Sequence, residues 1–435
     1  MITFSTHRRA FMKWIAAAPV FGAIATQSAM QRLSAATRKT ASAEVYRRLG
    51  VRPFINARGT WTYLSGSLEF PAVRQAMEAA SQHFVDMFEL QRAAGKRLAE
   101  LSGAESGMVT SGAAGAMAAA TAACIAGSDP KKVWQLPDTT GLKDEVIMLG
   151  GRSAFDNAIR LAGGKLVLAY NHEELGKAFS DKTAMVYTTW LGERLEKALE
   201  ITKRAGVPLM LDDAAGIPPI DNLSLYAKMG LDLYGFSGGK GLRGPQCSGL
   251  LLGRKDLIEA ALANCSPWEG AVCRSMKVGK EEIIGAITAV EEWKKMDLSK
   301  LDKEWSQRVE RIKKLVDTVP GVTTEIEIPK GGNRYPTLNV DWDEKAWNFT
   351  VADCDRELRA GEPRIEVLTA SNPSLVPAVL EGRPRRPQQA SRKDPPAERA
   401  NRLRIISMTL QEGEDLVVGQ RMREILNGAR KRAGV

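Results

Sequence analysis

A single lysine in a glycine-rich turn is the feature of the sequence with the most specific chemical potential. Lys240 lies in the run Ser237-Gly238-Gly239-Lys240-Gly241, between apolar runs at 233–236 and 249–252 that predict strands. Glycines allow unusual backbone dihedrals and the close approach of a ligand. This setting is typical of a lysine that forms a Schiff base with a carbonyl, its pKa lowered by burial. A plain β-turn with a solvated lysine is the alternative interpretation.

Two further motifs could cooperate with this lysine. A short apolar strand turns through Ser111-Gly112-Ala113 into an alanine-rich helix that we expect to reach about Ala126. The start of such a helix presents free backbone N–H groups to an anion, although tight helix–sheet packing would also explain the small residues. The run 207–211 predicts a strand, which Asp212 and Asp213 follow. A carboxylate there could point into a ligand crevice or cap a helix.

The elements that carry these residues alternate between strands and helices. Apolar runs predict strands at 145–149, 165–169 and 184–188, and helical spacing predicts helices at 72–87, 90–101, 155–161 and 195–205. This alternation predicts an α/β fold in which a mostly parallel sheet carries helices on both faces. Ligands then bind beyond the carboxyl ends of the strands.

The pattern after residue 295 is that of a smaller α+β domain. A long helix is predicted from 283 through 314, followed by strands at 322–328, 338–340, 364–368 and 403–408 and a closing helix at 414–426. Residues 382–404 hold eight basic and two acidic side chains among several prolines, which predicts a flexible surface insertion. We therefore predict a large domain at 44–295 and a small domain at 296–435.

The first residues resemble an export signal. Thr6-His7-Arg8-Arg9-Ala10-Phe11-Met12-Lys13 matches the twin-arginine pattern except at His7, and a weakly apolar segment at 14–25 follows. That segment is too short to span a membrane. We expect a signal peptide at 1–29, a linker at 30–43, recognition by the twin-arginine export machinery and a periplasmic protein. A basic amphipathic helix on a cytoplasmic protein is the alternative.

The distribution of charge argues against a nucleic-acid partner. The formal net charge is +10, but residues 1–43 and residues 382–404 each supply six net positive charges, so the remainder carries a net charge of −2. A dedicated surface for a phosphate backbone is not expected on such a body. The five cysteines have no CxxC spacing and there are three histidines, so we expect no metal site.

The lysine turn closely resembles one enzyme group. The run Phe236-Ser237-Gly238-Gly239-Lys240-Gly241-Leu242-Arg243-Gly244-Pro245-Gln246 is similar to the selenocysteine-synthase-like group of fold-type-I pyridoxal-phosphate enzymes. That group includes L-seryl-tRNA(Sec) selenium transferase and D-glucosaminate-6-phosphate ammonia-lyase. Residues 49–57 and 278–282 resemble it too. The resemblance covers 44–295 well and the C-terminal part loosely, and it implies a seven-stranded sheet and at least a homodimer.

The resemblance also implies a role for each motif. Lys240 would hold pyridoxal 5'-phosphate as a Schiff base, and Asp213, preferred to Asp212 from the family pattern of Asp-Ala-Ala before Pro-Pro, would pair with the ring nitrogen. The phosphate-binding residues would be Ser111, Gly112, Ala113 and Ser237, and the candidates for an anionic group of the substrate are Arg243, Arg364 and Arg58.

Two departures from the family concern the substrate. In the loop 149–156 a glycine stands where relatives place a His or an aromatic residue over the ring, and the segment 189–195 is short. The expected function is α,β-elimination of the ammonia-lyase type on a small amino acid or amino sugar acid. Racemisation by the same residues, or a non-catalytic binding protein that keeps the fold, remains open. Selenium transfer on tRNA is the least favoured, because of the charge distribution and the leader.

Overall fold

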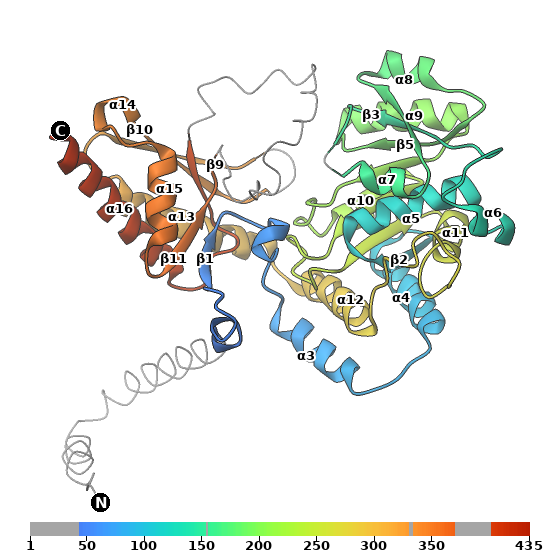
Figure 1. Cartoon of the computed structure of the whole chain (residues 1–435), viewed down its shortest axis with the longest axis horizontal. Helices are drawn as coiled ribbons and strands as arrows, with labels where there is room; N and C mark the ends of the chain where they lie inside the picture. The colour runs from blue at the N-terminus through green and yellow to red at the C-terminus, as the bar shows by residue number, and fades with distance from the viewer. Residues whose placement is uncertain (1–42, 154, 330–333, 370–401) are drawn as a thin grey trace, which may run out of the picture. The chain divides into compact units, whose positions relative to one another are not determined.

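The computed structural model describes residues 43–153, 155–329, 334–369 and 402–435 (Figure 1). By backbone contacts the chain divides into a small unit, Met1–Ile55 with Gly361–Arg364, and a large unit, Asn56–Ala360 with Ile365–Val435. The expected signal peptide, nearly all of the linker and residues 382–401 of the expected insertion lie outside the described residues. None of the helices in the described ranges is long and apolar enough to cross a membrane.

The large unit contains a seven-stranded sheet, as the resemblance implies. Its order is β2-β8-β7-β6-β5-β3-β4, and β8 alone runs against its neighbours. The strands are β2 (Ser106–Thr110), β3 (Glu145–Leu149), β4 (Lys165–Ala169), β5 (Thr183–Thr188), β6 (Leu209–Asp212), β7 (Leu233–Ser237) and β8 (Gly249–Gly253). The predicted mostly parallel sheet is therefore confirmed, and the turn that carries Lys240 joins its antiparallel pair β7–β8.

Helices cover both faces of this sheet because buried side chains alternate along each strand. On β6, Met210 packs in one core cluster with the alanines of α5, whereas Leu209 and Leu211 pack in a second cluster with α9, α10 and α12. The helices of this part are α3 (Pro71–Ser81), α4 (Met87–Ser102), α5 (Gly112–Ala126), α6 (Pro130–Gln135), α7 (Asn157–Leu161), α8 (His172–Ala178), α9 (Glu193–Ala205), α10 (Asn222–Met229), α11 (Lys255–Ala263) and α12 (Lys280–Lys295), with a 3₁₀ turn at Thr62–Leu64.

Two smaller sheets are formed mainly by the part of the chain that was predicted to be α+β, and β1 comes from the segment that was predicted to begin the large domain. The order β12-β10-β9 is antiparallel throughout, and β1 pairs with β11 in a two-stranded sheet. The elements are β1 (Phe54–Ala57), β9 (Val322–Glu327), β10 (Thr337–Trp342), β11 (Arg364–Val367), β12 (Leu403–Ile406), α13 (Leu298–Val316), α14 (Glu344–Trp347), α15 (Val351–Ala360) and α16 (Glu414–Ala433).

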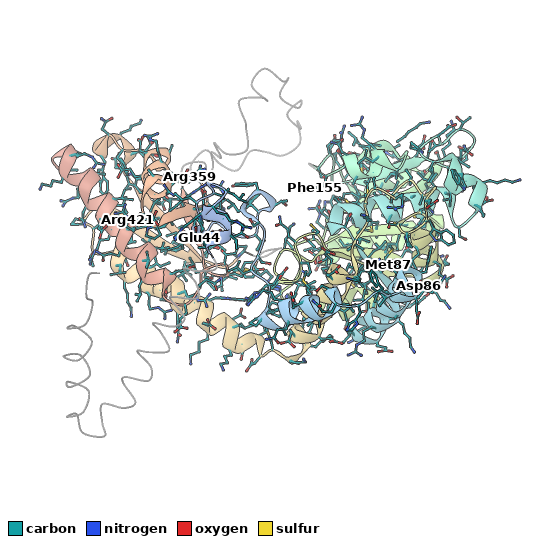
Figure 2. All side chains as sticks on the ribbon, turned by 60° about the horizontal axis from the view of Figure 1, so that its bottom comes forward. Glu44, Asp86, Met87, Phe155, Arg359 and Arg421 are labelled. Carbon is teal, nitrogen blue, oxygen red and sulfur yellow. The ribbon has the colours of Figure 1, made fainter. Side chains whose placement is uncertain are left out.

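The single helix predicted from 283 through 314 is wrong, because two helices occupy this stretch. Met296 at the end of α12 has extended backbone, and the Asp297 side chain accepts hydrogen bonds from the backbone N–H groups of Ser299 and Lys300. An aspartate in this position caps a new helix. Asp86 starts α4 in the same way, and Asp86 lies beside Met87 at the helix start in Figure 2.

Candidate active site

The turn between β7 and β8 holds Lys240 half-buried in a tightly bonded backbone. The Arg243 N–H donates to the Lys240 carbonyl at 3.0 Å. From α12, the indole N–H of Trp293 donates to the Gly241 and Leu242 carbonyls at 3.1 and 2.9 Å. The packed face of α12 therefore fixes the backbone from which the lysine side chain extends.

The glycines of this turn are required by close packing. A Cβ on Gly238 would lie 1.9 Å from Ser248 Oγ, and one on Gly241 would lie 1.9 Å from the Ile217 carbonyl oxygen. Neither glycine has a positive φ, so the expectation of unusual glycine dihedrals is wrong here. The turn residue with a positive φ is Arg243, at 56°.

Two adjacent carboxylates act on the charge of Lys240. Burial lowers the pKa of the lysine, and the charges of Asp212 and then Asp213 oppose this shift. Burial also raises the pKa of each aspartate. The Tyr187 hydroxyl donates to Asp212 Oδ2 at 2.8 Å, and the Tyr226 hydroxyl donates to Asp213 Oδ2 at 2.6 Å. Each carboxylate is thus held by its own tyrosine.

The two aspartates face opposite sides of the sheet. Tyr187 on β5 is in register with Met210 on β6, and Met210 packs against α5. Asp212, two residues after Met210, shares this face, as its bond to Tyr187 shows. Asp213 turns to Tyr226 of α10 on the other face. The geometry therefore favours Asp212 over the predicted Asp213 as the carboxylate on the side where α5 begins.

The start of α5 has the features of an anion site. Ser111 precedes the helix, no side chain caps its first turn, and Gly112 has a φ of 72°. Gly249 on β8 packs closely, since a Cβ there would lie 2.4 Å from the Gly112 carbonyl carbon. Ser237 is the register partner of Gly249, so the structure brings the predicted Ser237 toward Ser111 and Gly112. Uncapped N–H groups in a helix first turn bind anions.

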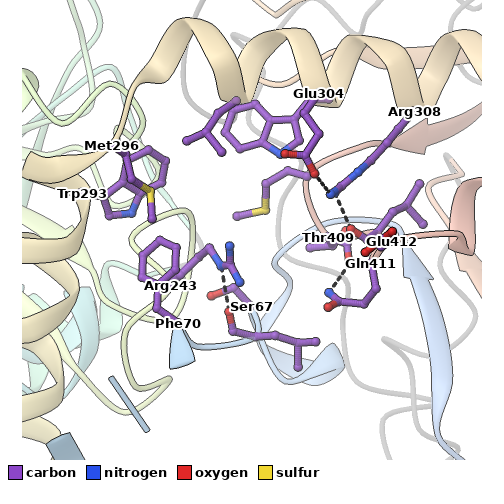
Figure 3. Close-up of a pocket in the computed structure, with 15 residues that line it drawn as sticks. Ser67, Phe70, Arg243, Trp293, Met296, Glu304, Arg308, Thr409, Gln411 and Glu412 are labelled. Atoms are coloured by element: carbon purple, nitrogen blue, oxygen red, sulfur yellow. Dashed lines mark hydrogen bonds and ion pairs between the residues drawn. The ribbon is translucent and has the colours of Figure 1, made fainter. Parts of the chain in front are cut away.

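The three predicted substrate arginines lie in different surroundings. Arg58 is buried and donates to the Val367 carbonyl at 2.6 Å. Arg364 begins β11, with its guanidinium 5.2 Å from the ring centre of Phe54. Arg243 lines a cavity that Figure 3 shows. The roles of these arginines toward a substrate stay predictions.

The loop predicted to lack an aromatic wall packs against a tryptophan. A Cβ on Gly150 would lie 2.7 Å from Trp190 Nε1, and Trp190 comes from the short segment 189–195. The Arg194 guanidinium lies over the Trp190 ring at 3.6 Å. Ser153 of the loop hydrogen-bonds the Tyr187 side chain, which places the loop against the Tyr187–Asp212 pair. The two segments that depart from the family pattern, 149–156 and 189–195, thus pack against each other.

Sequence reasoning missed Tyr187, Tyr226 and Trp293. Tyr187 lies inside the strand predicted at 184–188. It falls on the same side of that strand as the apolar Met185, so the sequence gave no indication that its hydroxyl bonds a carboxylate. The role of Tyr187 depends on the register of β5 against β6. That register places Tyr187 near the end of β6, where Asp212 is the last residue. Tyr226 and Trp293 come from helices whose facing residues only the tertiary packing reveals.

The large mixed sheet with helices on both faces is the fold of the fold-type-I pyridoxal-phosphate enzymes, and the solved structure of one such enzyme superposes on the chain. The chain belongs to the selenocysteine-synthase-like group of these enzymes. It is 33% identical over 350 residues to 5'-C-glycyluridine monooxygenase-decarboxylase of Streptomyces sp, covering 76% of this chain and 86% of that protein. No protein-family profile matches the chain.

Two other relatives belong to the group that the resemblance predicted. D-glucosaminate-6-phosphate ammonia lyase of Salmonella typhimurium is 28% identical over 335 residues, covering 73% of this chain and 87% of that protein. L-seryl-tRNA(Sec) selenium transferase of Moorella thermoacetica is 23% identical over 355 residues, covering 70% and 71%. The solved structure of D-glucosaminate-6-phosphate ammonia-lyase superposes with a TM-score of 0.71 at 26% identity, covering 88% of this chain and 98% of that one.

Proposed function

We propose that the protein is a pyridoxal-phosphate-dependent lyase that catalyses α,β-elimination on a small amino acid or amino sugar acid. The observation that carries the proposal is Lys240, half-buried in a fixed turn and electrostatically coupled to Asp212 and Asp213. The similarity to an ammonia lyase, in sequence and in structure, supports elimination as the reaction type.

The residues present fit the cofactor. The first turn of α5, with Ser111, Gly112 and Ala113, and the nearby Ser237 would hold its phosphate. Asp212, oriented by Tyr187, would face the ring nitrogen and favour its protonated form. When bound, pyridoxal phosphate supplies an aldehyde for the substrate amine and a ring that accepts electron density from the α-carbon.

Lys240 performs the proton transfer at the α-carbon. Burial lowers the pKa of the lysine, which raises the share of neutral amine available as a base near neutral pH. Nζ takes the α-proton, and the nearby charges of Asp212 and Asp213 stabilise the resulting ammonium. The same ammonium can protonate the group that leaves the β-carbon with its electron pair, or return the proton to the α-carbon in a racemisation.

A substrate screen tests this reaction. Full-length protein loaded with pyridoxal phosphate is mixed with D- and L-amino acids and aminated sugar acids, and ammonia and keto acid are measured with Lys240→Ala as the control. Release of both products by the wild type alone supports elimination. Loss of optical activity in deuterated water without ammonia indicates a racemase. Cofactor uptake with no turnover and no substrate-dependent spectral change indicates a binding protein.

A second candidate is an oxygen-dependent decarboxylation. The relative that favours it is the monooxygenase-decarboxylase of Streptomyces sp, at 33% identity over 350 residues. The same screen in an oxygen electrode separates the two reactions. Elimination predicts no oxygen uptake, whereas oxygen consumed in step with carbon dioxide release, without free ammonia, would replace the lyase proposal.

A further inference from the structure

Two cysteines without CxxC spacing come together in the segment that follows α11. Cys265 and Cys273 form an isolated parallel β-bridge, and the Cys273 N–H donates to the Asn264 carbonyl at 3.1 Å. Residues paired across neighbouring parallel strands lie about 4.8 Å apart and direct their side chains to the same face. That separation lies within the range of about 4.4–6.8 Å between the Cα atoms of a disulfide. The backbone therefore holds the two cysteines at a spacing that a disulfide can bridge.

The side chains of this pair meet as well. Both are free thiols, both are buried in the core cluster that α5 and α11 share, and the two thiols hydrogen-bond each other. This hydrogen bond lowers the pKa of Cys273 and raises the pKa of Cys265. The thiolate is the form of cysteine that reacts with oxidants. Cys273 is therefore suited to attack an oxidant, and Cys265 lies beside it as a resolving thiol.

The chain between the two cysteines lies at the surface and rests on two helices. Trp268 packs edge-on against Phe88 of α4, with the ring centres 4.7 Å apart. A Cβ on Gly270 would lie 2.6 Å from the Trp134 ring of α6. Trp268 and Glu269 are exposed, whereas the cysteines at the two ends of the segment are buried. This burial shields both thiols from a bulky disulfide oxidant, so a molecule as small as a hydroperoxide is the better-suited reactant.

The same segment adjoins the start of α5. Cys265 and Ser266 line a small cavity together with Ser111, and its volume of about 10 Å³ leaves room for one water molecule at most. At the other end of α5, Asn264 donates from Nδ2 to the Gly127 carbonyl at 2.8 Å. A covalent bond between the two cysteines would therefore restrict the movement of a segment that packs against both ends of this helix.

We propose that Cys265 and Cys273 are a redox site that hydrogen peroxide converts into a disulfide, which holds the segment 265–273 against α5. The Cys273 thiolate attacks one peroxide oxygen, the O–O bond breaks, and the hydroxide that leaves takes up the proton that Cys273 had lost. The Cys265 sulfur then attacks the sulfenic sulfur, the S–O bond breaks, and the second hydroxide leaves as water with the Cys265 proton. Two thiols and one peroxide thus give one disulfide and two waters, so each sulfur loses one electron and each peroxide oxygen gains one.

Peptide mapping after oxidation tests the pair in the full-length, cofactor-loaded protein. The protein is treated with a small excess of hydrogen peroxide, quenched with catalase, denatured and labelled at its remaining thiols with a maleimide. Two of the five cysteines should escape the label, and the segment should lose two hydrogen atoms. Cleavage after Glu269 separates the two cysteines, so the fragments should stay joined until a reductant is added. Five labelled cysteines, an oxygen retained on Cys273, or a disulfide to another cysteine would overturn the proposal.

Single substitutions separate the roles of the two thiols. Cys273→Ser should slow the oxidation of Cys265 at least about tenfold, whereas in Cys265→Ser the Cys273 sulfur should retain a sulfenic acid that dimedone traps. Cys354→Ala is the matched control. Cys354 is also buried, and burial raises the pKa of its thiol, so its removal should leave the rate of disulfide formation unchanged. Equal oxidation of Cys265 with and without Cys273 would contradict the assignment.

Thermal unfolding measures what the bond does to the protein. Because the disulfide would close a short loop in the unfolded chain, the oxidised wild type should have a Tm at least about 3 °C above that of the reduced wild type. Cys354→Ala should show the same gain on oxidation, and the double variant Cys265→Ala with Cys273→Ala should show none. The same Tm in both redox states of the wild type would overturn the claim that the bond holds the segment. Neither measurement needs turnover, so a failure of the proposed function leaves both outcomes decisive.

Discussion

Asp212 and Asp213 are neighbours in the chain, yet the strand directs them to opposite faces. The sequence motif alone favoured Asp213, since a pattern of residue types does not show which face of β6 meets α5. The register of Tyr187 with Met210 puts Asp212 on the face of the sheet that packs against α5, and on this ground we predict that Asp212 is the carboxylate that faces the cofactor. Asp213 instead lies against Gly216, where a Cβ would be 1.7 Å from the carboxylate.

Substituting the two aspartates separately tests this assignment. Asp212→Asn should lower turnover by about 100-fold or more, because an amide does not stabilise a protonated ring nitrogen. Asp213→Asn should lower it by less than about tenfold, since the amide oxygen still accepts the Tyr226 hydrogen bond. Turnover and the affinity for pyridoxal phosphate are measured on both isosteric variants. The reverse order of effects would restore Asp213.

The pH dependence of cofactor capture tests the state of Lys240. Only the neutral amine attacks the aldehyde, so the capture rate should rise with pH and reach its midpoint below 10.5, the ordinary lysine value, because burial lowers the lysine pKa. Asp212→Asn should move the midpoint lower still, since the Asp212 charge raises that pKa. Stopped-flow absorbance gives the profile. A midpoint at or above 10.5 would contradict a buried amine.

Among the elements, the strands of the sheet were predictable because each is a short apolar run bounded by turn residues. Thus 145–149 and 165–169 were predicted with the bounds that β3 and β4 have. The break between α12 and α13 was missed, since the helical periodicity continues across Met296 and the cap by Asp297 is a local hydrogen bond. The cavity around Arg243 could not be predicted, because its walls come from segments far apart in the chain.

The contact between β8 and the start of α5 is the packing on which the anion site depends. Gly249→Ala should destabilise the protein by about 1–3 kcal/mol, because the new Cβ would lie 2.4 Å from the Gly112 carbonyl carbon. It should also weaken pyridoxal-phosphate binding. Gly176→Ala in α8 is the matched control: no atom lies within 4 Å of its Cβ, so a gain of about 0.5–1 kcal/mol is expected. Urea unfolding of both variants gives the comparison; similar effects would refute the packing argument.

For the whole molecule, the placement of charge supports an exported, small-molecule enzyme. Each of two basic segments supplies six net positive charges and the rest carries −2, so we expect no surface for tRNA on that body. Export through the twin-arginine route carries folded proteins, so pyridoxal phosphate could be loaded before export. We propose a periplasmic homodimer on this basis and on the family resemblance.

Replacing the arginine pair tests the location. With Arg8→Lys and Arg9→Lys together, the protein should remain in the cytoplasm with its leader uncleaved, whereas the wild type should appear in the periplasmic fraction at a lower mass. Cell fractionation with mass spectrometry gives both readouts. Equal distribution of wild type and variant would show that the leader is not a twin-arginine signal.

Chemical trapping of the cofactor shows directly whether Lys240 is its point of attachment. Full-length protein is incubated with pyridoxal phosphate, reduced with borohydride, digested and mapped by mass spectrometry. We expect a single phosphopyridoxyl group on the peptide that contains Lys240, and none in Lys240→Ala. A label on another lysine, or no label on the wild type, would contradict this expectation.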